Sequence, residues 1–123
     1  MNRQLREKVW EKYGRRCAYC GREITYKQLQ VDHIDPKYRT WKSHPGGNDA
    51  FDNLNPSCAR CNNWKHAMPL DVFRSEIAAQ VARLRRYRSQ YRLALDFGLV
   101  TETGADVEFY FERHGQITGG TYG

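Results

Sequence analysis

Two short motifs organise this chain, CAYC at residues 17–20 and CARC at residues 58–61. A C-x2-C turn presents two thiolates to the same ion, and two such turns supply the four soft ligands of tetrahedral zinc. Structural disulfides are the weaker alternative, because two intervening residues suit metal knuckles or redox motifs better. A closed shell of four thiolates leaves no open position, so the predicted zinc is structural. Its ligands are Cys17, Cys20, Cys58 and Cys61.

The size and composition of the chain make this zinc important for folding. The sequence has 123 residues, of which 40% are hydrophobic, and its mean hydropathy is −0.84. A core of this size supplies little net stability, so a metal crosslink between the two motifs should decide whether the region folds. The sequence contains no apolar run of about 18 residues, which predicts no membrane helix. We expect a soluble, cytoplasmic protein.

Positive charge is concentrated on two segments that flank the motifs. The formal net charge is +6, and the excess of Lys and Arg lies in residues 1–22 and 67–98, whereas residues 99–123 are net acidic. Basic flanks attract a polyanion, most obviously nucleic acid, although a solvated basic surface is the plain alternative. The candidate contacts are Arg15, Arg16, Arg85 and Arg86.

The residues between the two motifs predict a ββα arrangement. Residues 29–34 alternate in polarity like a half-buried strand, which Asp35 and Pro36 end. Residues 37–52 contain a His-Pro-Gly-Gly-Asn-Asp run and predict a loop. Residues 53–56 can return as a second strand, and the CARC motif opens a short helix through Lys65. The predicted zinc then ties both ends of this unit together.

The flanking segments predict further elements. Leu5, Val9 and Tyr13 recur at helical spacing before Gly14, which predicts an N-terminal helix. One apolar face from Pro69 to Phe97 predicts a long basic helix that Gly98 stops.

Beyond Gly98, residues 107–112 alternate like a strand, which could form a hairpin with residues 99–100. The glycine-rich residues 115–123 predict a disordered tail. We therefore predict a small α+β fold in one domain, with a zinc-stapled core at 1–66 and an extension at 67–114.

The assembled motifs resemble the HNH endonuclease family, in particular its small zinc-containing members and the stand-alone HNH proteins of phages. The resemblance covers about residues 12–66 and implies a ββα-metal, or His-Me finger, core. The matching pieces are Cys17 to Gly21, Val31 to Pro36, Gly46-Gly47, Asp52 to Leu54, and Cys58 to Lys65.

The resemblance implies roles for individual residues. His33 matches the general base, and an imidazole that titrates near neutral pH suits that task. Asp32 matches the metal-binding acid beside it. Asn53 matches the asparagine that holds the catalytic histidine by hydrogen bonding, for which Asn48 and Asn55 are less favoured substitutes.

The last family position departs from histidine, because Asn62 stands there, as in many members. A carboxylate and an amide carbonyl are two oxygen ligands, which favours Mg(II) or Mn(II) as the catalytic ion. His66 is a possible substitute ligand or phosphate contact, although a surface histidine is commoner. Lys65 also fits the motif and could pair with a phosphate.

The implied function is one-metal hydrolysis of double-stranded DNA with weak sequence preference, because the ββα element is expected in the minor groove. Two alternatives stay open: a non-catalytic zinc module that binds DNA or protein, and an RNA-cleaving nuclease. The phage-like layout would fit a partner in the genome-packaging machinery. Oligomeric state, and nicking against double-strand cleavage, are not readable from these residues.

Overall fold

The computed structural model describes residues 1–37 and 46–114. The tail predicted at 115–123 lies outside these residues. The chain divides into two compact units. One contains Met1–Leu70 and the segment from Glu108 onward, and the other contains Asp71–Val107. The first unit carries both cysteine motifs and every candidate residue between them.

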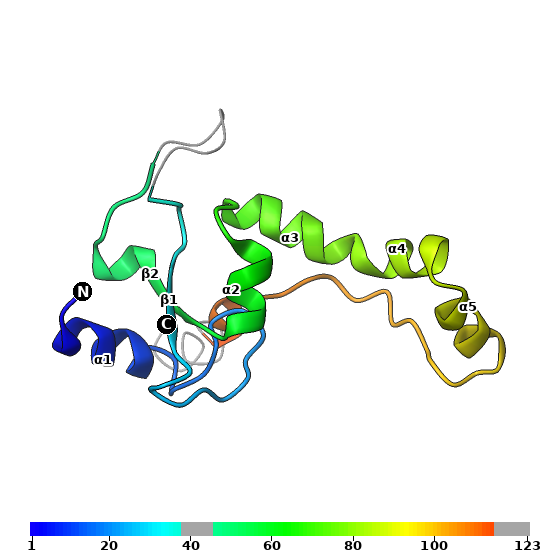
Figure 1. Cartoon of the computed structure of the whole chain (residues 1–123), viewed down its shortest axis with the longest axis horizontal. Helices are drawn as coiled ribbons and strands as arrows, with labels where there is room; N and C mark the ends of the chain where they lie inside the picture. Colours follow the sequence, from blue (N-terminus) through cyan, green and yellow to red (C-terminus); the bar gives the residue numbers. More distant parts are fainter. Residues whose placement is uncertain (38–45, 115–123) are drawn as a thin grey trace. The chain divides into compact units, whose positions relative to one another are not determined.

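The first unit is built on the expected ββα core. Strands β1 (Gln30–His33) and β2 (Leu54–Ser57) pair antiparallel, with Asp32 opposite Asn55. Helix α2 (Ala59–Lys65) follows β2 directly, and Figure 1 shows it beside the two strands. This arrangement confirms the predicted α+β class, with a four-cysteine cluster at one end of the core.

A single turn of 3-10 helix, η1 (Phe51–Asn53), leads into β2 and was not predicted from the sequence. The Leu54 N–H closes this turn on the carbonyl of Phe51. The turn ends the loop at Asn53, so that the side chain of this residue faces the end of β1.

Helix α1 (Arg3–Glu11) begins where the side chain of Asn2 caps it by accepting a hydrogen bond from the Leu5 N–H (2.8 Å). This is the usual way for an asparagine to satisfy a free amide of the first turn. Val9 is fully buried and anchors the helix to the core. The chain then turns through Gly14 at φ +67°, which confirms the predicted glycine stop.

The strand predicted at residues 107–112 is wrong. The chain is helical from Tyr110 to His114, and β1 and β2 form the only sheet among the described residues. The Tyr110 and Phe111 amides donate to the carbonyls of Tyr19 (3.0 Å) and Ala18 (2.8 Å). The aromatic rings of Phe109 and Phe111 pack around Tyr19. The alternating aromatics therefore anchor this segment to the first cysteine motif instead of pairing with a strand.

The single long helix predicted from Pro69 to Phe97 is also wrong. Three helices replace it: α3 (Leu70–Ala78), α4 (Gln80–Tyr87) and α5 (Ser89–Asp96). Between α4 and α5 the backbone of Arg88 is extended (φ −123°, ψ 102°). Nη1 of Arg92 in α5 donates to the carbonyl of Arg85 in α4 (2.6 Å), so that this bond spans the break between the two helices. In the described chain, no helix is both long and apolar enough to cross a membrane.

Candidate active site

The four cysteines form a cluster with the dimensions of a zinc site. Their Sγ atoms all lie within 4.8 Å of one another, and those of Cys20 and Cys58 are 3.8 Å apart. A tetrahedron with zinc–sulfur bonds of about 2.3 Å has edges of about 3.8 Å. The Cys61 amide donates to the Cys58 sulfur (3.4 Å), as expected for a knuckle that stabilises thiolates. The cluster can hold one zinc ion.

The protonation of the cluster supports this assignment. Hydrogen bonding from Cys61 lowers the pKa of Cys17 to about 4. The same bond raises the pKa of Cys61, because loss of its proton would place two thiolates side by side. The cluster thus stabilises a thiolate, which is the form that binds metal.

A cavity of about 200 Å³ lies beside β1 and α2. It collects candidate residues from both halves of the core, although they are far apart in the sequence. Asp32 and His33 come from the end of β1, whereas Asn62 comes from α2 and His66 directly follows that helix. The remaining lining residues are Val31, Pro36, Lys37 and Ala67.

The carboxylate of Asp32 is buried and already has two partners. The Tyr19 hydroxyl donates to its Oδ2, and the Lys65 Nζ lies 3.1 Å from the same oxygen. Burial raises the pKa of Asp32, and the ammonium of Lys65 opposes this shift. Burial and the nearby Asp32 charge also raise the pKa of Tyr19, so its hydroxyl stays a donor.

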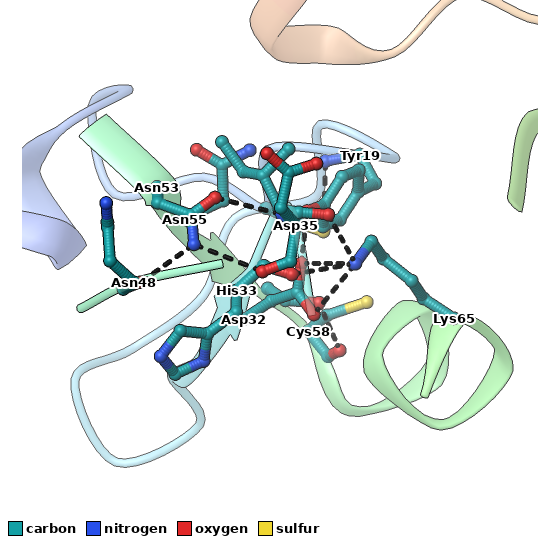
Figure 2. A network of polar contacts seen from close by, with 12 residues as sticks. Tyr19, Asp32, His33, Asp35, Asn48, Asn53, Asn55, Cys58 and Lys65 are labelled. Atoms are coloured by element: carbon teal, nitrogen blue, oxygen red, sulfur yellow. Dashed lines mark hydrogen bonds and ion pairs between the residues drawn. The ribbon is translucent and has the colours of Figure 1, made fainter. Parts of the chain in front are cut away.

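Lys65 is not the surface residue that the sequence suggested. Its side chain is 0% exposed, and its Nζ also donates to the carbonyls of His33 (2.9 Å) and Ile34 (3.2 Å). Figure 2 shows these bonds meeting at the lysine nitrogen. In this structure Lys65 holds the end of β1 and has no surface for a phosphate.

The His33 side chain is bonded to a residue that the sequence did not single out. Its Nε2 lies 2.8 Å from Oδ1 of Asp49, in the loop before η1. The hydrogen bond with His33 lowers the pKa of Asp49, with a further contribution from Lys37. The sequence held no spacing signal for this pair, because the loop brings the two residues together. Figure 2 shows the imidazole ring pointing away from Lys65.

The resemblance implied that Asn53 holds the His33 ring, but the structure gives its side chain other partners. Its Oδ1 accepts from the Asp35 amide (2.9 Å), and its Nδ2 donates to the carbonyls of Asp35 (3.1 Å) and Asn48 (2.8 Å). Among the described residues, these three bonds are the hydrogen bonds of its side chain. Asn53 therefore clamps the loop that carries Asp49 and acts on His33 only through it.

Gly47 lies inside this clamp. A Cβ atom at this position would stand 2.2 Å from the Asp35 carbonyl oxygen and 2.7 Å from Nδ2 of Asn53. The Gly47 amide donates to the carbonyl of Pro36 (2.6 Å). Only glycine fits between these groups, which accounts for Gly47 in the motif.

Among the described residues, only one polar atom of the Asn62 side chain has a hydrogen-bond partner. Its Nδ2 donates to Oε1 of Gln30 (2.6 Å). Its Oδ1 is left beside the cavity as an oxygen that can ligate a metal ion. With the Asp32 carboxylate, this gives the two oxygen ligands that a hard divalent ion prefers. The fit is partial, because Lys65 already neutralises the carboxylate. His66 borders the same cavity and has a positive φ of +47°.

The arginines offered as nucleic-acid contacts are mostly engaged elsewhere. Arg15 bonds Glu11, Arg16 bonds Glu23, and Arg85 bonds Glu102. Arg86 lies over the ring of Tyr87. Of the substitute asparagines, Asn55 is fully buried, and the side chain of Asn48 accepts from the Ala50 amide.

Comparison with known proteins gives a consistent result for the core. A family model described as HNH endonuclease matches residues 17–68. The CRISPR-associated endonuclease Cas9 of Actinomyces naeslundii is 33% identical over 87 residues, covering 65% of this chain and 7% of that protein. The Cas9 of Corynebacterium diphtheriae is 35% identical over 57 residues, covering 46% of this chain and 5% of that protein.

A solved structure agrees with the sequence matches. The crystal structure of the Type II-C Cas9 enzyme from Actinomyces naeslundii aligns with a TM-score of 0.50 and 32% identity. The alignment covers 70% of this chain and 10% of that one. The chain thus spans a tenth or less of the length of these relatives. They lend no support to a phage-type protein or to a partner in genome packaging.

Proposed function

We propose that this chain is a metal-dependent endonuclease that hydrolyses phosphodiester bonds of double-stranded DNA, because residues 17–68 match a family model described as HNH endonuclease. The proposal is carried by one observation, the meeting of Asp32, His33 and Asn62 at a single cavity. A scaffold has no chemical need for an acid, a base and an amide oxygen together. The fold alone does not decide the function, because one fold can carry many different sites.

His33 is the general base in this proposal. Its Nε2 hydrogen bonds to Asp49, so that its Nδ1 is left with a free lone pair. Nδ1 takes a proton from water as the water oxygen bonds to phosphorus. The bond between phosphorus and the 3′ oxygen then breaks, and that oxygen takes a proton from solvent. The products are a 5′ phosphate and a 3′ hydroxyl, and general-base catalysis of this kind contributes ~10²–10⁴-fold.

Asp32 and Asn62 are the residues that would hold a Mg(II) or Mn(II) ion. When bound, such an ion supplies positive charge for the phosphate and for the departing oxygen. The chain's own contribution is to present the two oxygen donors from different elements. Tyr19 and Lys65 keep the Asp32 carboxylate in place, and Gln30 keeps the Asn62 amide turned with its oxygen available.

The test is cleavage of supercoiled plasmid by wild type, His33→Ala and a control histidine variant, His114→Ala. We expect nicked or linear product from wild type and from the control when Mg(II) or Mn(II) is present, and none with a chelator of divalent ions. His33→Ala should lose most of this activity while keeping its bound zinc. Normal cleavage by His33→Ala would overturn the assignment of the base.

One observation favours a second candidate, a zinc-stabilised module that binds DNA or protein without cleaving it. The ion pair with Lys65 gives Asp32 a structural role that needs no catalytic ion. This reading predicts DNA retention without cleavage in any divalent metal. The same plasmid experiment, with a gel-shift lane for each protein, separates the two candidates.

A further inference from the structure

A second cavity, which we call the basic groove, lies on the first unit. It has a volume of about 300 Å³ and is lined by three cationic side chains, Arg22, Lys27 and Arg60. Gln28 and Gln30 add amide groups, and Glu23 is the one carboxylate among the lining residues. These residues come from the segment between the first cysteine motif and β1, and from the start of α2.

The positive charge of this groove is not neutralised within the described chain. Arg22, Lys27 and Arg60 are exposed, and none has an ion pair with any described residue. Glu23 is itself bonded to Arg16 (3.2 Å). By contrast, five other arginines are paired with glutamates: Arg3, Arg15, Arg16, Arg83 and Arg85. Three uncompensated cations around one hollow attract an anion.

The groove is linked directly to the candidate active site. Gln30 lines the groove, and its Oε1 accepts the hydrogen bond from Asn62, which lines the other cavity. Gln30 also precedes Asp32 by two positions on β1, so that the two residues are about 6.6 Å apart along the strand. An anion in the groove would therefore be a near neighbour of a phosphate at His33.

We propose that the basic groove binds a backbone phosphate of the DNA strand that is cut, beside the scissile phosphate. This inference rests on the proposed nuclease function and specifies the position of the DNA strand that is cut. Two guanidinium groups offer fork-shaped donors that match phosphate oxygens, and the Lys27 ammonium adds a point charge. Such contacts fix the position of the strand without reading its sequence, which agrees with weak sequence preference.

A competing role for the same cations is to balance the zinc cluster. Cys58 also lines the groove, and four thiolates around one zinc ion carry a net charge of 2−. If Arg22 and Arg60 served only that purpose, their loss would weaken zinc retention and leave DNA affinity unchanged per folded molecule. Measuring zinc content beside DNA affinity distinguishes the two roles.

The experiment neutralises each cation, as Arg22→Gln, Lys27→Gln and Arg60→Gln, in the His33→Ala background so that bound DNA is not cut. Binding to a fluorescent duplex is measured by anisotropy from low to high salt. Each change should weaken binding roughly threefold to tenfold and reduce the slope of log K against log salt by about 1. Lys8→Gln is the matched control, because Lys8 is exposed on α1, has no ion pair among the described residues and lies outside the groove.

The outcomes separate the groove from the function it rests on. If the groove variants and Lys8→Gln bind alike while the unmodified chain cuts plasmid, the groove inference fails and the nuclease proposal stands. If the unmodified chain neither cuts nor binds DNA, both fail. Loss of zinc from the groove variants, with unchanged affinity in the zinc-loaded fraction, assigns the cations to the cluster and overturns the inference.

Discussion

The carboxylate of Asp32 and the ammonium of Lys65 form a buried ion pair that joins β1 to α2. Both charges are almost completely removed from water, with 4% and 0% of the side chains exposed. Burying two charges is costly, and the cost is offset only when the remaining donors and acceptors are satisfied. Here Tyr19 and two backbone carbonyls complete the network. The pair therefore holds the candidate metal-binding acid in one position.

Lys65→Met tests this role. Removal of the ammonium leaves the Asp32 carboxylate buried without a counterion, so the free energy of unfolding should fall by about 3–5 kcal/mol. Urea denaturation with zinc present measures the change. Combining the change with Asp32→Asn should restore part of the stability, because no charge is then left buried. Asn63→Ala, at an exposed position of the same helix, should have a small effect; an equally small effect of Lys65→Met would contradict the prediction.

The bond between His33 and Asp49 leads to a prediction about pH. The folded-state pKa of Asp49 lies below its ordinary value of 3.8, because His33 and then Lys37 favour the carboxylate. A lowered pKa means that this interaction is present above about pH 3.8 and is lost as the pH falls through the folded value. In His33→Gln, the Asp49 pKa should rise toward 3.8, as measured by carboxyl carbon NMR. Lys37→Gln should raise it less, and no rise in His33→Gln would exclude the bond.

At the scale of elements, the loop between β1 and β2 matters as much as the strands. The side chain of Asn53, at the end of η1, hydrogen bonds to the backbone of Asp35 and so joins the two ends of this loop. The clamp determines where Asp49 lies and so which way the His33 ring is held. Alternation of polar and apolar residues predicted the first strand, and the second was expected within about one residue of its observed place. Neither prediction carried information about these contacts across the loop.

Gly47→Ala is the change that should break the clamp. The added methyl group would collide with the Asp35 carbonyl and with the Asn53 amide, so the loop must shift at a cost of about 1–3 kcal/mol. Hydrogen exchange of the Ile34 and Asp35 amides, which bond Asn53, should become faster. Gly14→Ala is the control, since its methyl group meets open space and costs only the left-handed strain of about 1–2 kcal/mol. Unchanged exchange in Gly47→Ala would rule out the clamp.

On the scale of the whole molecule, the zinc cluster joins the first cysteine motif to the start of α2. The first unit has a small apolar core, and several of its buried residues are polar or charged, including Asn55 and Lys65. A core of this kind contributes little net stability by itself. A zinc ion held by the four cysteines would then supply a large part of the folding energy of this unit.

Cys58→Ser should therefore abolish both zinc binding and the fold of the first unit. Metal analysis by mass spectrometry and far-ultraviolet circular dichroism measure the two losses. His33→Ala is the matched comparison, because it should keep zinc and the native spectrum. A Cys58→Ser protein with native structure and no zinc would show that the cluster does not stabilise the fold.

The meeting of Asp32, His33 and Asn62 at one cavity was implied by the resemblance to the HNH endonuclease family. Spacing and residue type in the chain were sufficient for the ββα core and the four-cysteine cluster. These features depend on local periodicity and on ligand chemistry, both of which are encoded over a few residues. The helical turn at Tyr110 was decided by packing, because its aromatic residues can reach Tyr19 in more than one backbone conformation. The break between α4 and α5 lies at the extended backbone of Arg88, which the apolar pattern did not indicate. The burial of Lys65, the partner of His33 and the ion pairing of the arginines depend on which side chains meet across the fold. Only the tertiary structure brings Lys65 to Asp32 and Asp49 to His33.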